Sequence, residues 1–136
     1  MLKLGYVSTY PPTHCGIAEY TRFLARALRT LYPEAGLYVF ADIGVGGSDA
    51  RYDGIVEVYP SFLSGGSDDY KRVLDALSSI NGLDILHVQH EYGIFGHDTR
   101  ILEACLEAKR EKLVKKIVFT LHTVYHPLAQ RPSALA

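Results

Sequence analysis

Short apolar runs alternate with amphipathic segments along most of the chain. Residues 4–7 form an apolar run that suits a strand buried on both faces of a sheet. After it, the inward-facing positions recur at the helical period, at Ile17, Thr21, Leu24, Leu28 and Leu31. The alternation continues and predicts strands at 4–7, 37–41, 55–59, 83–89 and 115–123, with helices at 17–31, 67–80 and 99–113.

Capping and turn residues mark where these elements begin and end. Ser67 is the expected N-cap of the second helix, and the acidic pair Asp68 and Asp69 suits the positive end of its dipole. The dipeptide Asn81-Gly82 predicts its end. Asp98 is the expected cap of the third helix, and the glycine-rich residues 44–54 predict a surface loop before a strand near the sheet edge.

Strands that alternate with helices predict the α/β class, with a doubly wound, mainly parallel sheet and helices on both faces. The 136 residues fit a single domain, 1–136. In such sheets ligands bind beyond the carboxyl ends of the strands. We therefore expect the loops 9–16 and 90–96 and the strand end 122–123 to open on one cleft, shared by His14, His90, Glu91, Tyr92 and His122.

Composition and charge exclude several classes of protein. A hydrophobic content of 48% and a formal charge of −1 do not fit a disordered chain or a basic nucleic-acid binder. No apolar run approaches the ~20 residues of a membrane span, so we expect any membrane contact to be peripheral. Two cysteines form no disulfide framework, and Met1 stands almost directly before the first strand, which favours the cytoplasm.

The turn between the first strand and the first helix contains the clearest candidate for anion binding. Backbone N–H groups around Cys15, Gly16 and Ile17 begin the helix and carry partial positive charge, which suits a phosphate. Gly16 has no Cβ and lets a ligand approach the backbone. The loop has one glycine and lacks the Lys-Ser/Thr ending of a P-loop, so a glycine that only eases a tight turn is the alternative interpretation.

Three motifs together resemble a known family. They are STYPPTHCGIAEYT at 8–21, HVQHEYGIFG at 87–96 and TLHTVYHP at 120–127. In this order and spacing they resemble the N-terminal half of glycosyltransferase family 4, whose retaining enzymes have the GT-B fold and use activated sugar donors. The resemblance covers essentially the whole chain, and it implies a Rossmann-like domain that binds the acceptor and closes over the donor diphosphate.

The resemblance also implies roles for individual residues. Cys15, Gly16 and Ile17 would approach the diphosphate of a nucleotide-sugar, and His122 matches the active-site histidine at the end of a core strand. The acceptor, a hydroxyl compound such as a sugar, lipid-linked sugar or polyol, would be bound by Tyr10, His14, His90, Glu91, Tyr92 and Thr123. Tyr10 and Tyr92 also suit stacking on a sugar ring, with ordinary packing as the alternative.

The family's second, C-terminal domain supplies most donor contacts, and this sequence does not contain it. We therefore expect this chain to need that domain as a partner and to be inactive alone. No resident cofactor is expected, because the nucleotide-sugar is itself the donor substrate. The predicted compartment is the cytoplasm, with possible peripheral contact at the inner membrane face.

Two other functions remain open from the sequence. One is a free-standing module that binds a nucleotide or phosphate without chemistry. The other is a metal- or thiol-dependent hydrolase, with Cys15 and His122 as the thiol pair. Metal binding by His87, His90, Glu91 and His97 is disfavoured, because residues three apart on a strand point to opposite faces. His87 is an expected core histidine bonded to backbone, and His97 and His126 are expected at the surface.

Overall fold

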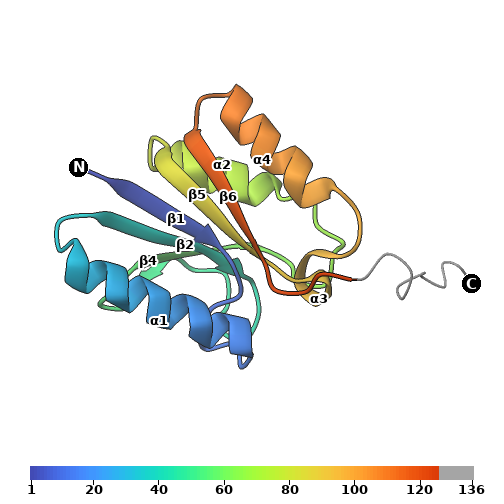
Figure 1. Cartoon of the computed structure of the whole chain (residues 1–136), viewed down its shortest axis with the longest axis horizontal. Helices are drawn as coiled ribbons and strands as arrows, with labels where there is room; N and C mark the ends of the chain where they lie inside the picture. Colours follow the sequence, from blue (N-terminus) through green and yellow to red (C-terminus); the bar gives the residue numbers. More distant parts are fainter. Residues whose placement is uncertain (126–136) are drawn as a thin grey trace, which may run out of the picture.

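The computed structural model describes residues 1–125 and contains a six-stranded sheet in the order β3-β4-β2-β1-β5-β6 (Figure 1). All neighbouring strands are parallel except β3 and β4, which are antiparallel. The strands are β1 (Lys3–Val7), β2 (Gly36–Asp42), β3 (Arg51–Tyr52), β4 (Glu57–Phe62), β5 (Leu83–His90) and β6 (Val114–Leu121). The helices are α1 (Gly16–Leu31), α2 (Lys71–Ser79), α3 (Tyr92–Phe95) and α4 (Arg100–Arg110). The predicted α/β class with a mainly parallel sheet is confirmed.

Helices cover both faces of the sheet, α1 on one side and α2 and α4 on the other (Figure 1). Neighbouring residues of β2 point into different cores, since successive side chains on a strand alternate. Val39 packs with Ala25 of α1, whereas Phe40 packs in the core that includes Leu77 of α2 and Cys105 of α4. Among the described residues 1–125, no helix has the length and apolar character needed to cross a membrane.

The strand order reverses between β1 and β5, which creates the position where ligands bind in such sheets. β1 pairs with β2 on one side and with β5 on the other, both in parallel. The chain leaves β1 toward α1 on one face, and later leaves β5 toward α4 on the opposite face. The two connections separate at the carboxyl ends of β1 and β5 and leave a crevice there.

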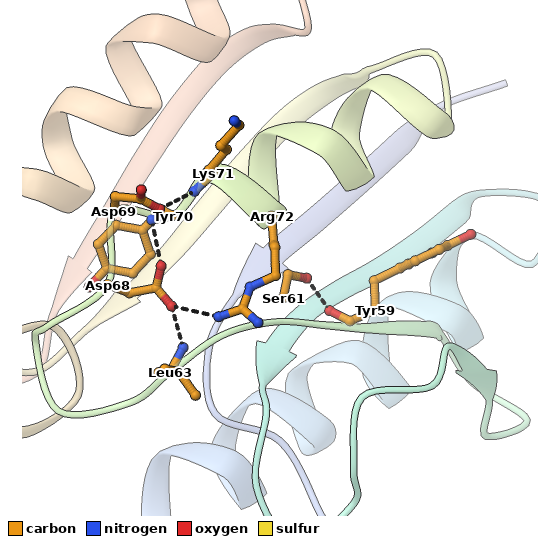
Figure 2. Close-up of polar contacts among 8 residues, drawn as sticks. All are labelled: Tyr59, Ser61, Leu63, Asp68, Asp69, Tyr70, Lys71 and Arg72. Atoms are coloured by element: carbon orange, nitrogen blue, oxygen red, sulfur yellow. Dashed lines mark hydrogen bonds and ion pairs between the residues drawn. The ribbon is translucent and has the colours of Figure 1, made fainter.

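The start of α2 differs from the sequence prediction, because Ser67 is not its N-cap. The helix begins at Lys71, and its N-cap is Tyr70 with a left-handed backbone (φ 61°). The carboxylate of Asp68 accepts hydrogen bonds from the backbone N–H of Leu63 (2.6 Å) and of Tyr70 (2.8 Å), as Figure 2 shows. Asp68 therefore organises the turn before the helix and leaves no capping role for Ser67.

Other differences between the sequence prediction and the structure are smaller. The loop 44–54 contains β3, which forms a short hairpin with β4, and the stretch after β5 contains the single-turn α3. The N-cap of α4 is Thr99 rather than the predicted Asp98, whose carboxylate accepts a hydrogen bond from the N–H of Arg100 (3.0 Å), the first residue of the helix. The predicted stop at Asn81-Gly82 is confirmed, with φ of 60° and 79°. Leu31, placed inward by the periodicity, is 69% exposed at the end of α1.

Candidate functional site

A cavity of about 520 Å³ lies at the carboxyl edge of the sheet, beside the reversal of strand order. Three connections that are far apart in sequence contribute to it, together with Ser64 from the β4–α2 connection. The β1–α1 connection and α1 contribute Thr9, Thr13, Cys15, Gly16, Ile17 and Tyr20. The stretch after β5 contributes Glu91, Gly93 and Ile94, and the end of β6 contributes His122. The structure thus brings together Cys15, Gly16, Ile17, Glu91 and His122.

Helix α1 presents its N-terminus to this cavity. Cys15 is the N-cap residue, and its Sγ accepts a hydrogen bond from the N–H of Ala18 (3.3 Å). The same sulfur lies 3.0 Å from Oγ1 of Thr9. The N–H groups of Gly16 and Ile17 lie in the first turn of the helix, where no helix carbonyl oxygen can accept their hydrogen bonds, so they are available to a ligand. The arrangement offers two backbone donors and the positive end of the helix dipole.

Gly16 is not required by the packing of the protein itself. A Cβ built on Gly16 meets no heavy atom within 4 Å, so it would enter open space. Gly82 is a contrasting case, because its φ is +79° and a Cβ there would lie 2.6 Å from the carbonyl oxygen of Leu113. A side chain at position 16 would therefore occupy volume at the cavity without disturbing the fold.

Side chains from β2 and β3 hold the β1–α1 loop in place. Asp42, at the end of β2, accepts from the N–H of Tyr10 (3.1 Å) and from the hydroxyl of Thr13 (2.6 Å). Arg51 of β3 donates to the carbonyl oxygen of Pro11 (2.8 Å). These bonds fix the loop before the helix begins, so the donors at its N-terminus do not depend on a ligand for their position.

The ring of Tyr10 is buried in the core, where it is not accessible to a ligand. Its ring is 2% exposed and packs in the core beneath α1, and its hydroxyl donates to Oδ2 of Asp53 (2.6 Å). Burial, followed by the hydrogen bond to Asp53, raises the pKa of Tyr10 above its ordinary value. Ordinary packing, the alternative left open by the sequence, is therefore the role the structure gives to Tyr10.

His122 is held at the cavity by its backbone and by its ring. Its N–H donates to the carbonyl oxygen of His90 (2.9 Å), which extends the pairing of β5 and β6 by one residue. Nε2 of the imidazole lies 2.7 Å from Oε1 of Gln89 on β5. The ring of Tyr20 meets the imidazole edge-on, with centroids 5.2 Å apart.

His90 and Tyr92 do not line this cavity, which corrects the expectation of a single cleft. They line a second cavity of about 360 Å³, with Phe119 and Leu121 among its apolar walls. His90 is 9% exposed and stacks on Phe95, and burial lowers its pKa. The cause is the alternation along β5, because Gln89 and His90 are consecutive and point to opposite faces of the sheet.

Two further residues predicted to bind the acceptor also lie outside the main cavity. His14 is exposed on the β1–α1 loop, and Thr123 is half-buried just after β6, without bordering the cavity. Among the other histidines, His97 is exposed and stacks on Tyr92 (4.5 Å between centroids). His126 lies outside the described residues. His87 is bonded to Oγ1 of Thr120 (2.6 Å), a side chain rather than the expected backbone group, and burial lowers its pKa.

Sequence reasoning missed several residues that border the cavity, including Thr9, Tyr20 and Ser64. Tyr20 had a usable signal, since it follows Gly16 by four residues and therefore lies on the same side of the helix. Ser64 had a weaker signal, since it follows the predicted strand 55–59, and the carboxyl ends of parallel strands lie at the same edge of the sheet. Gln89 was also missed as a partner of His122, although the strand alternation places it on the face opposite to His90.

The described residues that line the cavity carry little side-chain charge. Glu91 is the one charged side chain among the described residues that line it. Its Oε2 accepts from the N–H of Gly93 (2.7 Å) and so caps α3. Within residues 1–125, the cavity offers an anion backbone N–H groups rather than Lys or Arg side chains. An anionic ligand held here would need cations from another source for full neutralisation.

Comparisons with protein-family models, with curated proteins and with solved structures gave no significant match. The fold and the geometry of the cavity are therefore the observations on which a function can be argued.

Proposed function

We propose that this chain is the acceptor-side half of a glycosyltransferase that moves a sugar from a nucleotide-sugar to a hydroxyl acceptor. One observation carries the proposal: Gly16 at the start of α1 and His122 at the end of β6 line the same cavity. A helix N-terminus suits a diphosphate, and an imidazole suits a sugar hydroxyl. The two chemistries of a nucleotide-sugar are thus available within one cavity, as the resemblance to glycosyltransferase family 4 implies.

The proposed roles follow from the chemistry of each group. The N–H groups of Gly16 and Ile17 stabilise charge on the diphosphate as the sugar leaves, which is where electrostatic stabilisation contributes most. His122 contacts the reacting sugar. Glu91 also lines the cavity. We propose that its carboxylate accepts a hydrogen bond from an acceptor hydroxyl and repels the phosphates.

The missing cations are the reason to propose a partner. A leaving diphosphate needs more positive charge than two backbone donors supply, so we propose a second, donor-binding domain that closes over the cavity. On this proposal the chain alone does not transfer sugar and needs no resident cofactor. The proposed compartment is the cytoplasm, with a peripheral position at a membrane when the acceptor is lipid-linked.

Ligand titration of the isolated chain tests the proposal. We expect UDP-, GDP- or ADP-sugars, at millimolar concentration, to shift the backbone amide signals of Gly16 and Ile17 in an ¹⁵N spectrum. His122→Ala should remove the part of the affinity that depends on the sugar and leave binding of the free nucleoside diphosphate unchanged. His14→Ala is the matched control, because His14 is an exposed histidine outside the cavity.

The possible results separate the hypotheses. Equal binding of nucleotide and nucleotide-sugar, with no effect of His122→Ala, would contradict the sugar-transfer proposal and favour the free-standing nucleotide-binding module. Absence of any shift at Gly16 and Ile17 with all three nucleotide classes and with inorganic pyrophosphate would remove the anion site as well.

A thiol hydrolase is the second candidate, because Cys15 and His122 border the same cavity. Against it, the sulfur of Cys15 is engaged with the N–H of Ala18 and with the hydroxyl of Thr9, as a helix cap. Hydrolysis of p-nitrophenyl acetate that is lost in Cys15→Ser, with iodoacetamide alkylation of Cys15 as a second readout, would support this candidate. We expect no such hydrolysis above the rate in buffer.

A further inference from the structure

We propose that Gln89 is a positioning residue for His122. In this arrangement Gln89 holds the imidazole as the Nε2–H tautomer and leaves its Nδ1 lone pair for a ligand hydroxyl. The inference deepens the proposed function, on which its relevance to sugar binding rests. The tautomer of His122 is a property of the chain itself and can be measured without any ligand.

The first support is the rigidity of Gln89. Its side chain is fully buried (0% exposed) within β5, and it pairs in register with Thr120 of β6. His122 follows Thr120 by two residues, so the strand alternation places it on the same face as Gln89. The bond from the N–H of His122 to the carbonyl oxygen of His90 then sets the distance between the two strands at this level.

The second support is the direction of the hydrogen bond. Oε1 of Gln89 is a carbonyl oxygen and only accepts, so the 2.7 Å contact is a hydrogen bond when the Nε2 of His122 carries the proton. A neutral imidazole has one such proton, which makes Nδ1 the acceptor. Nδ1 has no hydrogen-bond partner within residues 1–125. The ring therefore suits a donor such as a sugar hydroxyl, rather than a phosphate oxygen.

The third support is that Gln89 satisfies only half of its own amide. Its Nε2 is buried and has no hydrogen-bond partner among the described residues. A buried amide left in this state lowers stability compared with an apolar side chain of similar shape. Packing alone would favour such an apolar side chain, so the glutamine is better explained by the bond that it makes to His122.

A second histidine on the same two strands, His87, bonds to a side chain of the neighbouring strand and provides an internal control. His87 of β5 lies 2.6 Å from Oγ1 of Thr120 of β6. A threonine hydroxyl donates or accepts, so this pair does not determine the tautomer of His87. The contrast separates the effect of a carbonyl partner from the general effect of a partly buried position in the sheet.

The test is ¹⁵N and ¹H spectroscopy of the imidazoles in the full chain at about pH 8, where an ordinary imidazole is neutral. We expect His122 to show a protonated Nε2 with an N–H proton that exchanges slowly enough to be observed. Gln89→Met keeps the volume and removes the acceptor, so this N–H signal should disappear while the free energy of unfolding stays equal or rises. Thr120→Val should change the signals of His87 and leave those of His122 as they were.

The unmodified chain is sufficient to overturn the inference, even where a variant fails to fold. A proton on Nδ1 of His122, or exchange between both tautomers, would contradict it. So would an unchanged N–H signal in folded Gln89→Met. Adding a nucleotide-sugar to each protein then tests the proposed function separately. A correct tautomer without any ligand-induced shift would keep the positioning role and reject sugar binding.

Discussion

The ring of Tyr20 stands nearly perpendicular to the imidazole of His122, at an angle of 84° with centroids 5.2 Å apart. This edge-on geometry is a favourable arrangement for two aromatic rings. It connects the second turn of α1 to the end of β6, two elements that are not neighbours in sequence. Both rings line the cavity that we propose as the site of sugar binding.

Removing this ring should weaken ligand binding without unfolding the protein. Tyr20 is 48% exposed, so Tyr20→Ala loses little core packing, but it frees the imidazole and opens the cavity wall. We expect nucleotide-sugar affinity to fall about two- to tenfold, the range for an aromatic pair. Phe23→Ala is the control, since Phe23 is 61% exposed on the same helix and outside the cavity. Equal losses in both variants would mean that Tyr20 acts only through the helix.

Gly16→Val tests whether the open space at the start of α1 belongs to a ligand. A Cβ at this position meets nothing within 4 Å, so the free energy of unfolding should change by no more than about 0.5 kcal/mol. Diphosphate affinity should fall at least about tenfold, because the side chain occupies the approach to the N–H groups. Thermal unfolding and ligand titration measure the two effects.

The control for that substitution is Gly82→Ala, remote from the cavity at the turn after α2. Its left-handed backbone and the close carbonyl of Leu113 should make the variant less stable by about 1–3 kcal/mol, with affinity unchanged. An affinity that survives Gly16→Val would remove the diphosphate site from α1.

Tyr10→Phe separates the structural role of Tyr10 from binding. The variant loses the bond to Asp53, and we expect the free energy of unfolding to fall by about 1 kcal/mol, since water replaces the phenol at the exposed carboxylate. Ligand affinity should not change, because the buried ring does not border the cavity. Tyr52→Phe, at a tyrosine that is 64% exposed, should be neutral in urea unfolding. A clear loss of affinity in Tyr10→Phe would restore the predicted contact with the acceptor.

Asp68 should make stability depend on pH. Burial raises its pKa, but the N–H groups of Leu63 and Tyr70, with Arg72 nearby, outweigh burial and hold it below the ordinary value of 3.8. A carboxyl whose pKa is lower in the folded protein stabilises the fold above the unfolded pKa, and this contribution is lost as pH falls through the folded value.

Urea unfolding of Asp68→Asn checks this direction. At about pH 7 the variant should be less stable than the parent by about 1–3 kcal/mol, and the difference should shrink once the pH falls below about 4. Asp69→Asn is the control, because Asp69 is exposed and accepts one bond, from the N–H of Lys71 (3.0 Å). A difference that grows as the pH falls would contradict the assignment.

Local patterns in the sequence were sufficient for most of the longer elements of the fold, but not for β3, for α3 or for the start of α2. The apolar runs and helical periods place β1, α1, β2, β5, α4 and β6 to within a few residues, because burial on one or two faces imposes a period on each element. The start of α2 was wrong, since it depends on Asp68 bonding back to Leu63 across the turn. No local propensity reports a bond of that kind.

For the cavity, the sequence by itself determined that the β1–α1 loop, the stretch after β5 and the end of β6 share one edge, because parallel strands end on the same side. Only the tertiary structure decided which side chains enter it. Alternation along β5 sends His90 to one face and Gln89 to the other, and packing beneath α1 buries Tyr10. The position of a residue after the end of a parallel strand determines which edge of the sheet it reaches. Strand register and packing determine which way its side chain points.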